Sequence, residues 1–223
     1  MFFERVCLIS TAVLVVVSAA PRLIRSAVPK WHYPCGRDYD VEEASWEDLE
    51  EEMAMSLRKI RMQHQLLMGD YLNRDYNYLY ERIDFSLKKK QYIPNWLPDE
   101  RDVDLVRGLA NANPQTIANH FPKLYTDLQK FAVAFEQLVK DEDDVKKWEA
   151  LEGTQTYLNL MLCEVESNIL TLPSLRLPKR VQRSIMSEHE RVLSDETDRL
   201  IRDWGVILKY RDYLHAWRHV FNY

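Results

Sequence analysis

Residues 148–172 read WEALEGTQTYLNLMLCEVESNILTL. Apolar side chains recur in this stretch, from Trp148 onward, at intervals of three and four residues, the spacing that places them on one face of an α-helix. Leu160, Met161 and Leu170 widen this stripe, so we expect a helix that buries more than one of its faces. The helix should form the centre of the fold, and it carries Cys163.

The composition argues against several classes of protein. The chain has 223 residues, of which 46% are hydrophobic and 29% charged, as is typical of a globular domain. Only 5 residues are glycine, which argues against a turn-rich β fold and against a glycine-rich phosphate loop. The formal net charge of -5 disfavours a general nucleic-acid binder, because such proteins usually carry a surplus of basic residues.

Residues 1–20 have the pattern of a secretory signal peptide. The apolar run Val6–Val17 is followed by small residues that offer a cleavage site near Ala19 or Ala20. An uncleaved anchor is the alternative, but a spanning helix needs about 20 apolar residues, and Pro21 ends this run early. We therefore expect a secreted, extracellular protein with no stable membrane insertion after the leader is removed.

Two cysteines, Cys35 and Cys163, remain once the leader and its Cys7 are removed. An even number of cysteines in an oxidising compartment favours a single Cys35–Cys163 disulfide. The alternative is two unpaired thiols, one in the segment before the first helix and one inside the central helix.

Three prolines and a glycine predict an extended, non-helical segment over residues 21–39. Trp31 and Tyr33 are large for a free tail, so we expect them to pack against the helices; a contact surface for a partner is the alternative.

Residues 40–223 are expected to form one all-α domain, a four-helix bundle with a long first crossover and the extended N-terminal segment before it. A long crossover allows two consecutive helices to run parallel. His64 lies on the apolar stripe of the first helix, where a core or boundary position is expected. The predicted long helices begin near Asp40 or Ser45 (interrupted at Gly69–Asp70), at about Pro122, at Trp148 and at about Lys179, and a short helix is expected within Asp99–Ala110.

The pair Lys179–Arg180 resembles a dibasic processing site. Cleavage there would remove a whole predicted helix, so we interpret the pair as a helix start. The acidic run Asp141–Asp144 lacks the spaced ligands and the turn glycine of an EF-hand. It is interpreted as a solvated loop followed by the acidic first turn of the central helix.

No catalytic motif is recognisable. His215 and His219 have the spacing of a zinc-binding pair on one helix face, but Ala216 stands where the metalloprotease pattern requires a glutamate. Asp212 with His215 comes nearest to the Glu-x-x-His motif of di-iron helical proteins, without matching it. We expect no metal, no cofactor and no enzymatic activity.

The leader, four long amphipathic segments, a long first crossover and one disulfide resemble a long-chain four-helix-bundle cytokine or growth factor. The resemblance covers roughly residues 40–223 and lies in this layout. It implies a rigid ligand whose first, third and last helices contact cell-surface receptors, with binding as the whole mechanism. The outward residues that it indicates on the first and last helices are Arg58, Arg61, Arg74, Tyr78, Arg191, Asp195 and Arg202.

A second hypothesis is an extracellular helical carrier for a hydrophobic small molecule. Wide apolar faces rich in aromatic residues and methionine are able to enclose a pocket for an apolar ligand. A structural secreted protein or a host-directed effector is compatible with the same composition.

Overall fold

Four long helices dominate the computed structural model, which describes residues 28–36, 49–76, 79 and 94–222. They are α1 (Leu49–Asp70), α5 (Phe121–Asp141), α6 (Val145–Thr171) and α8 (Glu196–Phe221). All regular structure in these ranges is helical, as the sequence predicts. The shorter elements are η1 (Lys30–His32), η2 (Tyr71–Tyr76), α3 (Glu100–Arg107), α4 (Pro114–Ala118), η3 (Arg183–Ile185) and α7 (Glu188–Arg191).

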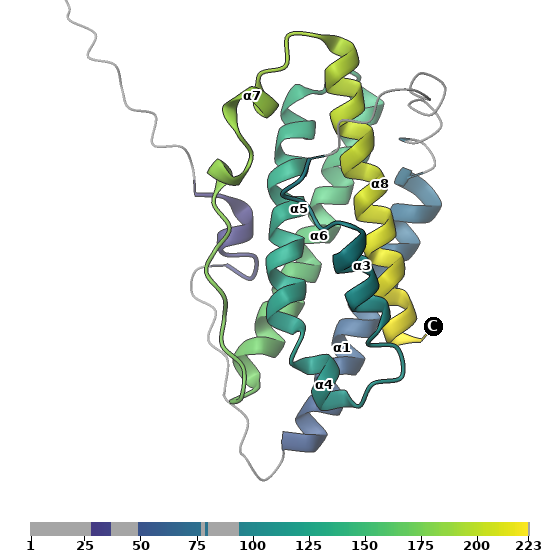
Figure 1. Ribbon diagram of the computed structural model, residues 1–223, viewed down its shortest axis with the longest axis vertical. Coiled ribbons are helices and arrows are strands. Elements are labelled where there is room, and N and C mark those ends of the chain that lie inside the picture. Colours follow the sequence, from purple (N-terminus) through teal and green to yellow (C-terminus); the bar gives the residue numbers. More distant parts are fainter. Residues whose placement is uncertain (1–27, 37–48, 77–78, 80–93, 223) are drawn as a thin grey trace, which may run out of the picture.

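Helix α5 runs antiparallel to both α6 and α8 (Figure 1). Only residues 142–144 separate α5 from α6, so the chain reverses directly from one to the other. The end of α5 lies near the start of α8, where Asp141 pairs with Arg202 at 2.9 Å. Nearer the start of α5, Asp127 accepts a hydrogen bond from the hydroxyl of Tyr213 at 2.9 Å, close to the end of α8.

Helix α1 also runs antiparallel to α8. Its end approaches the middle of α8, where the Tyr71 hydroxyl donates to the carbonyl of Ile207 at 3.3 Å. Earlier in α1, the ring of His64 lies 5.2 Å from that of Phe221, at the end of α8. Consequently α1 and α5 point one way, while α6 and α8 point the other way (Figure 1).

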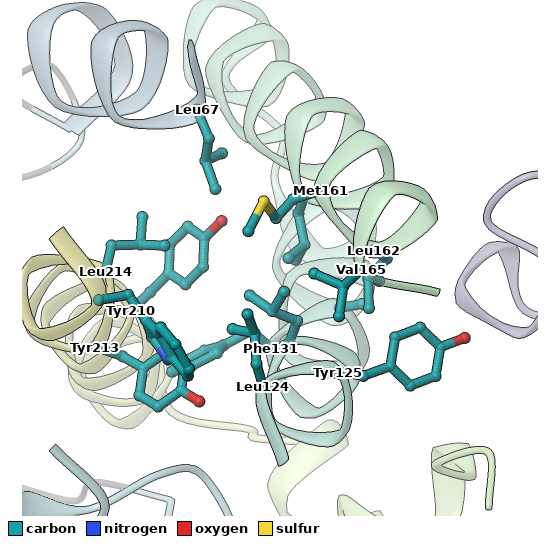
Figure 2. Close-up of a cluster of buried hydrophobic side chains, with 14 of the residues drawn as sticks. Leu67, Leu124, Tyr125, Phe131, Met161, Leu162, Val165, Tyr210, Tyr213 and Leu214 are labelled. Carbon is teal, nitrogen blue, oxygen red and sulfur yellow. The ribbon is translucent and has the colours of Figure 1, made fainter. Parts of the chain in front are cut away.

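The core lies where these helices meet. Figure 2 shows side chains from all four of them converging, including Leu67 from α1, Phe131 from α5, Met161 from α6 and Tyr210 from α8. The Phe131 and Tyr210 rings are 5.0 Å apart, within the favourable range for aromatic pairs. Burying these large apolar surfaces is the dominant favourable term in folding.

The central stretch is helical, as predicted. Asp144 caps α6 by accepting a hydrogen bond from the backbone N–H of Lys147 at 3.0 Å. The expectation that this helix buries a wider stripe is met in part, because Met161 is fully buried, whereas Leu160 and Leu170 are exposed, as is Trp148 at its start. Its buried residues lie on the side that contacts α1 and α5.

The predicted start of the last helix is wrong. Helix α8 begins at Glu196, not near Lys179, and Asp195 caps it through the backbone N–H groups of Thr197 and Asp198. Residues 172–195, here called the crossing segment, contain only η3 and α7. Contacts with α5 explain why this segment is not helical. The backbone N–H of Val181 donates to the side chain of Gln129 on α5, so it does not donate to a helical carbonyl.

Several smaller predictions are confirmed. Helix α3 forms within the range expected for a short helix, and α1 ends at Asp70, where η2 continues it as a π-helical turn. His64 is fully buried. The expected start of the first helix, the signal peptide and Tyr78 lie outside the described residues. Within those residues, no helix combines the length and apolar character needed to cross a membrane.

Candidate functional site

The predicted contact residues on α1 and η2 lie at the surface. Arg58 and Arg61 are exposed on α1. Arg74 is exposed on η2, but its guanidinium already pairs with the buried carboxylate of Asp75 at 2.6 and 2.9 Å. It also lies 5.6 Å above the ring of Tyr157. Arg74 therefore has a clear structural role in joining η2 to α6.

The residues predicted near the last helix hold one end of the molecule together. Arg191 is half-buried in the crossing segment and donates to the side chain of Gln137 at 3.0 Å. Burial lowers the pKa of its guanidinium. Asp195 is exposed, and its carboxylate caps α8. Neither residue lies on the outward face of α8 itself.

The expectation that Arg202 lies on an outward face is wrong, because its side chain is fully buried. The guanidinium pairs with Asp203 at 2.7 Å and Asp141 at 2.9 Å, and it donates to the carbonyl of Glu190 at 2.9 Å. Burial raises the pKa of Asp203 to about 6, against the opposing effect of Arg202. This cluster joins α5, α7 and the first turns of α8.

Exposed apolar side chains mark a surface that the sequence reasoning missed. Met62 and Leu66 lie one turn apart on α1 and are 63% and 56% exposed. Leu160, 51% exposed, lies on the outward side of α6, the neighbour of α1. The available signal was that Met62 and Leu66 are apolar and yet fall outside the apolar stripe that the spacing of Leu49, Met53, Leu57, Ile60 and Leu67 predicts.

The outward side of α8 is basic toward its C-terminal end. His215 is half-buried there, and Arg218 and His219 are exposed. Partial burial lowers the pKa of His215, and the positive charges of Arg211 and Arg218 add to that effect. In the described residues, no group of three His, Cys, Asp or Glu side chains has a geometry that could hold a metal ion.

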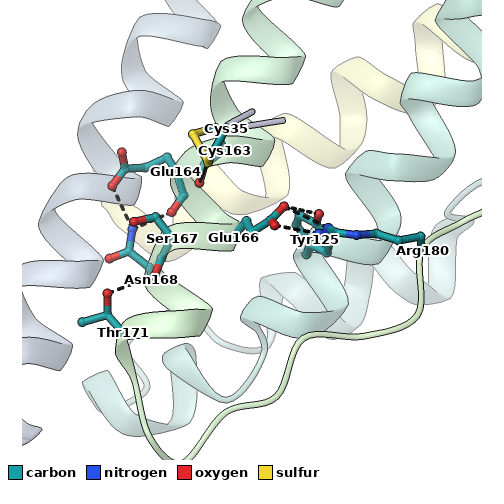
Figure 3. Close-up of a disulfide and its surroundings, with 9 residues drawn as sticks. All are labelled: Cys35, Tyr125, Cys163, Glu164, Glu166, Ser167, Asn168, Thr171 and Arg180. Atoms are coloured by element: carbon teal, nitrogen blue, oxygen red, sulfur yellow. Dashed lines mark hydrogen bonds and ion pairs between the residues drawn. A yellow bond between two sulfur atoms is a disulfide. The ribbon is translucent and has the colours of Figure 1, made fainter. Parts of the chain in front are cut away.

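Residues 28–36, here called the N-terminal clasp, pack against α6 and the crossing segment. The predicted Cys35–Cys163 disulfide is present and joins Cα atoms 4.8 Å apart (Figure 3). Trp31 is buried, as predicted, and its indole N–H donates to the carbonyl of Val181 at 2.9 Å. Tyr33 is 49% exposed, so it packs only in part, unlike the fully buried Trp31.

Glu166 connects the crossing segment to the interior beside the disulfide (Figure 3). Arg180 makes two hydrogen bonds to its carboxylate, at 2.6 and 2.9 Å, and Tyr125 donates a third at 2.5 Å. Burial raises the pKa of Glu166 to about 7 and lowers that of Arg180. The group joins α5, α6 and the crossing segment.

Surface hollows in the described residues are lined mainly by charged side chains. One of about 680 Å³ lies between α3 and α8, with Val103 and Leu208 among the residues around Glu100 and Asp104. At its edge, Lys209 of α8 donates to the carbonyls of Pro94 and Leu97, which precede α3. These hydrogen bonds help to position α3 against α8.

Comparison of the chain with known proteins finds no matching family model, no similar curated protein and no similar solved structure.

Proposed function

We propose that this chain is a secreted four-helix-bundle ligand, similar to a cytokine or growth factor, that acts by binding a cell-surface receptor. The observation that carries the proposal is the direction of the four long helices. Two helices pointing one way are followed by two pointing the other way, with long connections before α5 and before α8. This up-up-down-down order with two long crossovers is the topology of growth-hormone and cytokine bundles.

The packing order of the helices supports the same proposal. Helix α1 contacts α6 and α8, and α5 contacts the same two helices, so the parallel helices lie diagonally across a shared core. The disulfide and the buried Arg202 cluster brace this arrangement at separate places. A rigid ligand of this kind presents its outward helix faces with little entropy to lose on binding.

The surface of α1 is the proposed receptor contact. Interface hot spots usually combine apolar or aromatic anchors with arginine. Met62 and Leu66 supply exposed apolar anchors, and Arg58 and Arg61 on the same helix supply positive charge. Arg202 is removed from the proposed contact set because it is buried. Arg74 binds the buried carboxylate of Asp75, and Arg191 and Asp195 lie outside the outward face of α8. The exposed apolar pair Met62 and Leu66 therefore makes α1 the better place to begin.

Substitution on this surface tests the proposal. The labelled secreted protein should bind intact cells of its own source saturably, and Leu66→Glu should weaken that binding at least tenfold, as expected for a hot-spot residue. Leu105→Glu, a matched change at an exposed leucine of α3, should leave binding unchanged. Circular dichroism should show both variants folded. Equal binding by wild type and Leu66→Glu would remove α1 as the contact surface.

A carrier of an apolar molecule is the second candidate. The buried hydroxyl of Tyr210 has no hydrogen-bond partner among the described residues, and an internal ligand would meet it within the core. Native mass spectrometry of the secreted protein tests this directly. A mass equal to that of the polypeptide alone supports the receptor ligand, whereas a stoichiometric apolar adduct supports the carrier.

A further inference from the structure

Lys179–Arg180 is the only Lys-Arg pair in the sequence. The sequence predicts a helix start at this pair, but the structure places it in a part of the crossing segment that has no regular secondary structure, ahead of η3. Lys179 is exposed there. Endoproteases bind their substrates in an extended conformation, and no helix has to unwind at this pair before a dibasic-directed enzyme could bind it.

The residues on both sides of the Arg180–Val181 bond, which such an enzyme would cut, are nevertheless held by contacts with α5 and α6. On one side, the Arg180 side chain is bound by Glu166 at 2.6 and 2.9 Å and lies 5.3 Å above the ring of Tyr125. On the other side, Val181 is buried and its N–H donates to Gln129 at 2.7 Å. A protease would have to extract both residues before it could bind them.

The N-terminal clasp covers the backbone carbonyl of Val181. The carbonyl of Val181 accepts the Trp31 indole N–H at 2.9 Å and lies 3.0 Å from Nε2 of His32. Arg183 pairs with Glu136 at 2.7 Å, and its guanidinium lies 5.5 Å above the Trp31 ring. The Cys35–Cys163 disulfide ties the clasp to α6.

We propose that Lys179–Arg180 is a latent cleavage site for a dibasic-directed secretory endoprotease, and that the disulfide-tied clasp closes it. Hydrolysis adds water across the Arg180–Val181 peptide bond, leaving a carboxylate on Arg180 and an amino group on Val181. Both cysteines precede the cut, so no disulfide would retain the released chain that contains α8. Chains that have closed the clasp keep α8 covalently attached, whereas chains that have not are cut. The proposal shares with the proposed function only the assumption of secretion.

The test is digestion of the purified, disulfide-bonded protein with a kexin-type endoprotease, which cleaves after Lys-Arg. Wild type should resist, while Trp31→Ala and the Cys35→Ser, Cys163→Ser double variant should release a fragment beginning at Val181 at least ten times faster. Val28→Ala is the matched control, because it shortens an exposed apolar side chain in the same clasp, and it should behave as wild type. Adding Lys179→Gln to Trp31→Ala should abolish the cut.

Circular dichroism separates local opening from loss of the fold. Glu166→Gln provides a milder opening, because it weakens the hold on Arg180 without touching the clasp, and its cleavage rate should lie between those of wild type and Trp31→Ala. Cleavage of wild type as fast as Trp31→Ala would show that the clasp closes nothing. Resistance of Glu166→Gln and of both clasp variants would show that the pair is not a latent site. Neither result depends on receptor binding.

Discussion

Replacing the buried Arg202 with methionine should strongly destabilise the protein. Methionine keeps much of the side-chain length but removes the charge, which leaves the carboxylates of Asp141 and Asp203 without their cation. Removing one partner of a buried ion pair typically costs about 3–5 kcal/mol, because the other charge remains buried and unpaired. The carbonyl of Glu190 also loses its donor. We expect a loss of about 4 kcal/mol at pH 7.

The loss should depend on pH in a defined direction. Burial raises the pKa of Asp203 to about 6 in the folded protein, above its ordinary value of 3.8. Such a group favours folding most below its ordinary pKa and loses that contribution as the pH rises through about 6. Arg202 lowers this pKa, so its removal should raise the value further. The difference between variant and wild type should therefore shrink as the pH falls from 7 toward 4.

Urea unfolding, followed by tryptophan fluorescence at pH 7 and pH 4.5, measures both effects. Arg107→Met is the control, since it removes an exposed guanidinium paired with an exposed carboxylate, and its effect should stay within about 0.5 kcal/mol. A loss below about 1 kcal/mol at pH 7 for Arg202→Met would refute the reasoning. A loss of equal size at both pH values would refute the role assigned to Asp203.

Three further perturbations test other parts of the structure. The Cys35→Ser, Cys163→Ser double variant should unfold at lower urea, with a loss of up to about 5 kcal/mol in the chain-entropy picture, because the disulfide joins residues 128 apart; a midpoint equal to that of wild type would contradict this. Glu166 has a pKa raised to about 7, so its contribution to wild-type stability should fall as the pH rises from 5 to 8. In urea titrations, Glu166→Gln should flatten this change of stability with pH, and a pH dependence equal to that of wild type would contradict the role of Glu166. Asp195→Ala should cost about 1 kcal/mol through loss of the α8 cap while leaving cell binding intact; weakened binding by folded protein would restore Asp195 as a receptor contact.

Local patterns were sufficient to predict the central part of the fold. The 148–172 stretch and the helix expected to begin at about Pro122 correspond to α6 and α5, because their apolar periodicity coincides with the face that is buried. The disulfide followed from counting the cysteines outside the predicted leader. These inferences depend on neighbours along the chain and on composition, which a single sequence displays.

The missed features depend on contacts between distant residues. The crossing segment is not helical because Val181 and Arg180 bond to Gln129 and Glu166 across the molecule. Arg202 looked like a surface charge because its partner Asp141 is remote in sequence. Leu160 continued an apolar stripe, but the described residues place no element over that side of α6 that would bury it.

Equilibrium binding of the purified, disulfide-bonded protein to intact cells of its own source tests the central claim most directly. The claim predicts saturable binding that unlabelled protein displaces completely and that proteolysis of the cell surface abolishes. Binding that rises linearly with concentration and resists displacement would contradict a receptor ligand, and a stoichiometric apolar adduct on the same preparation would assign the fold to a carrier.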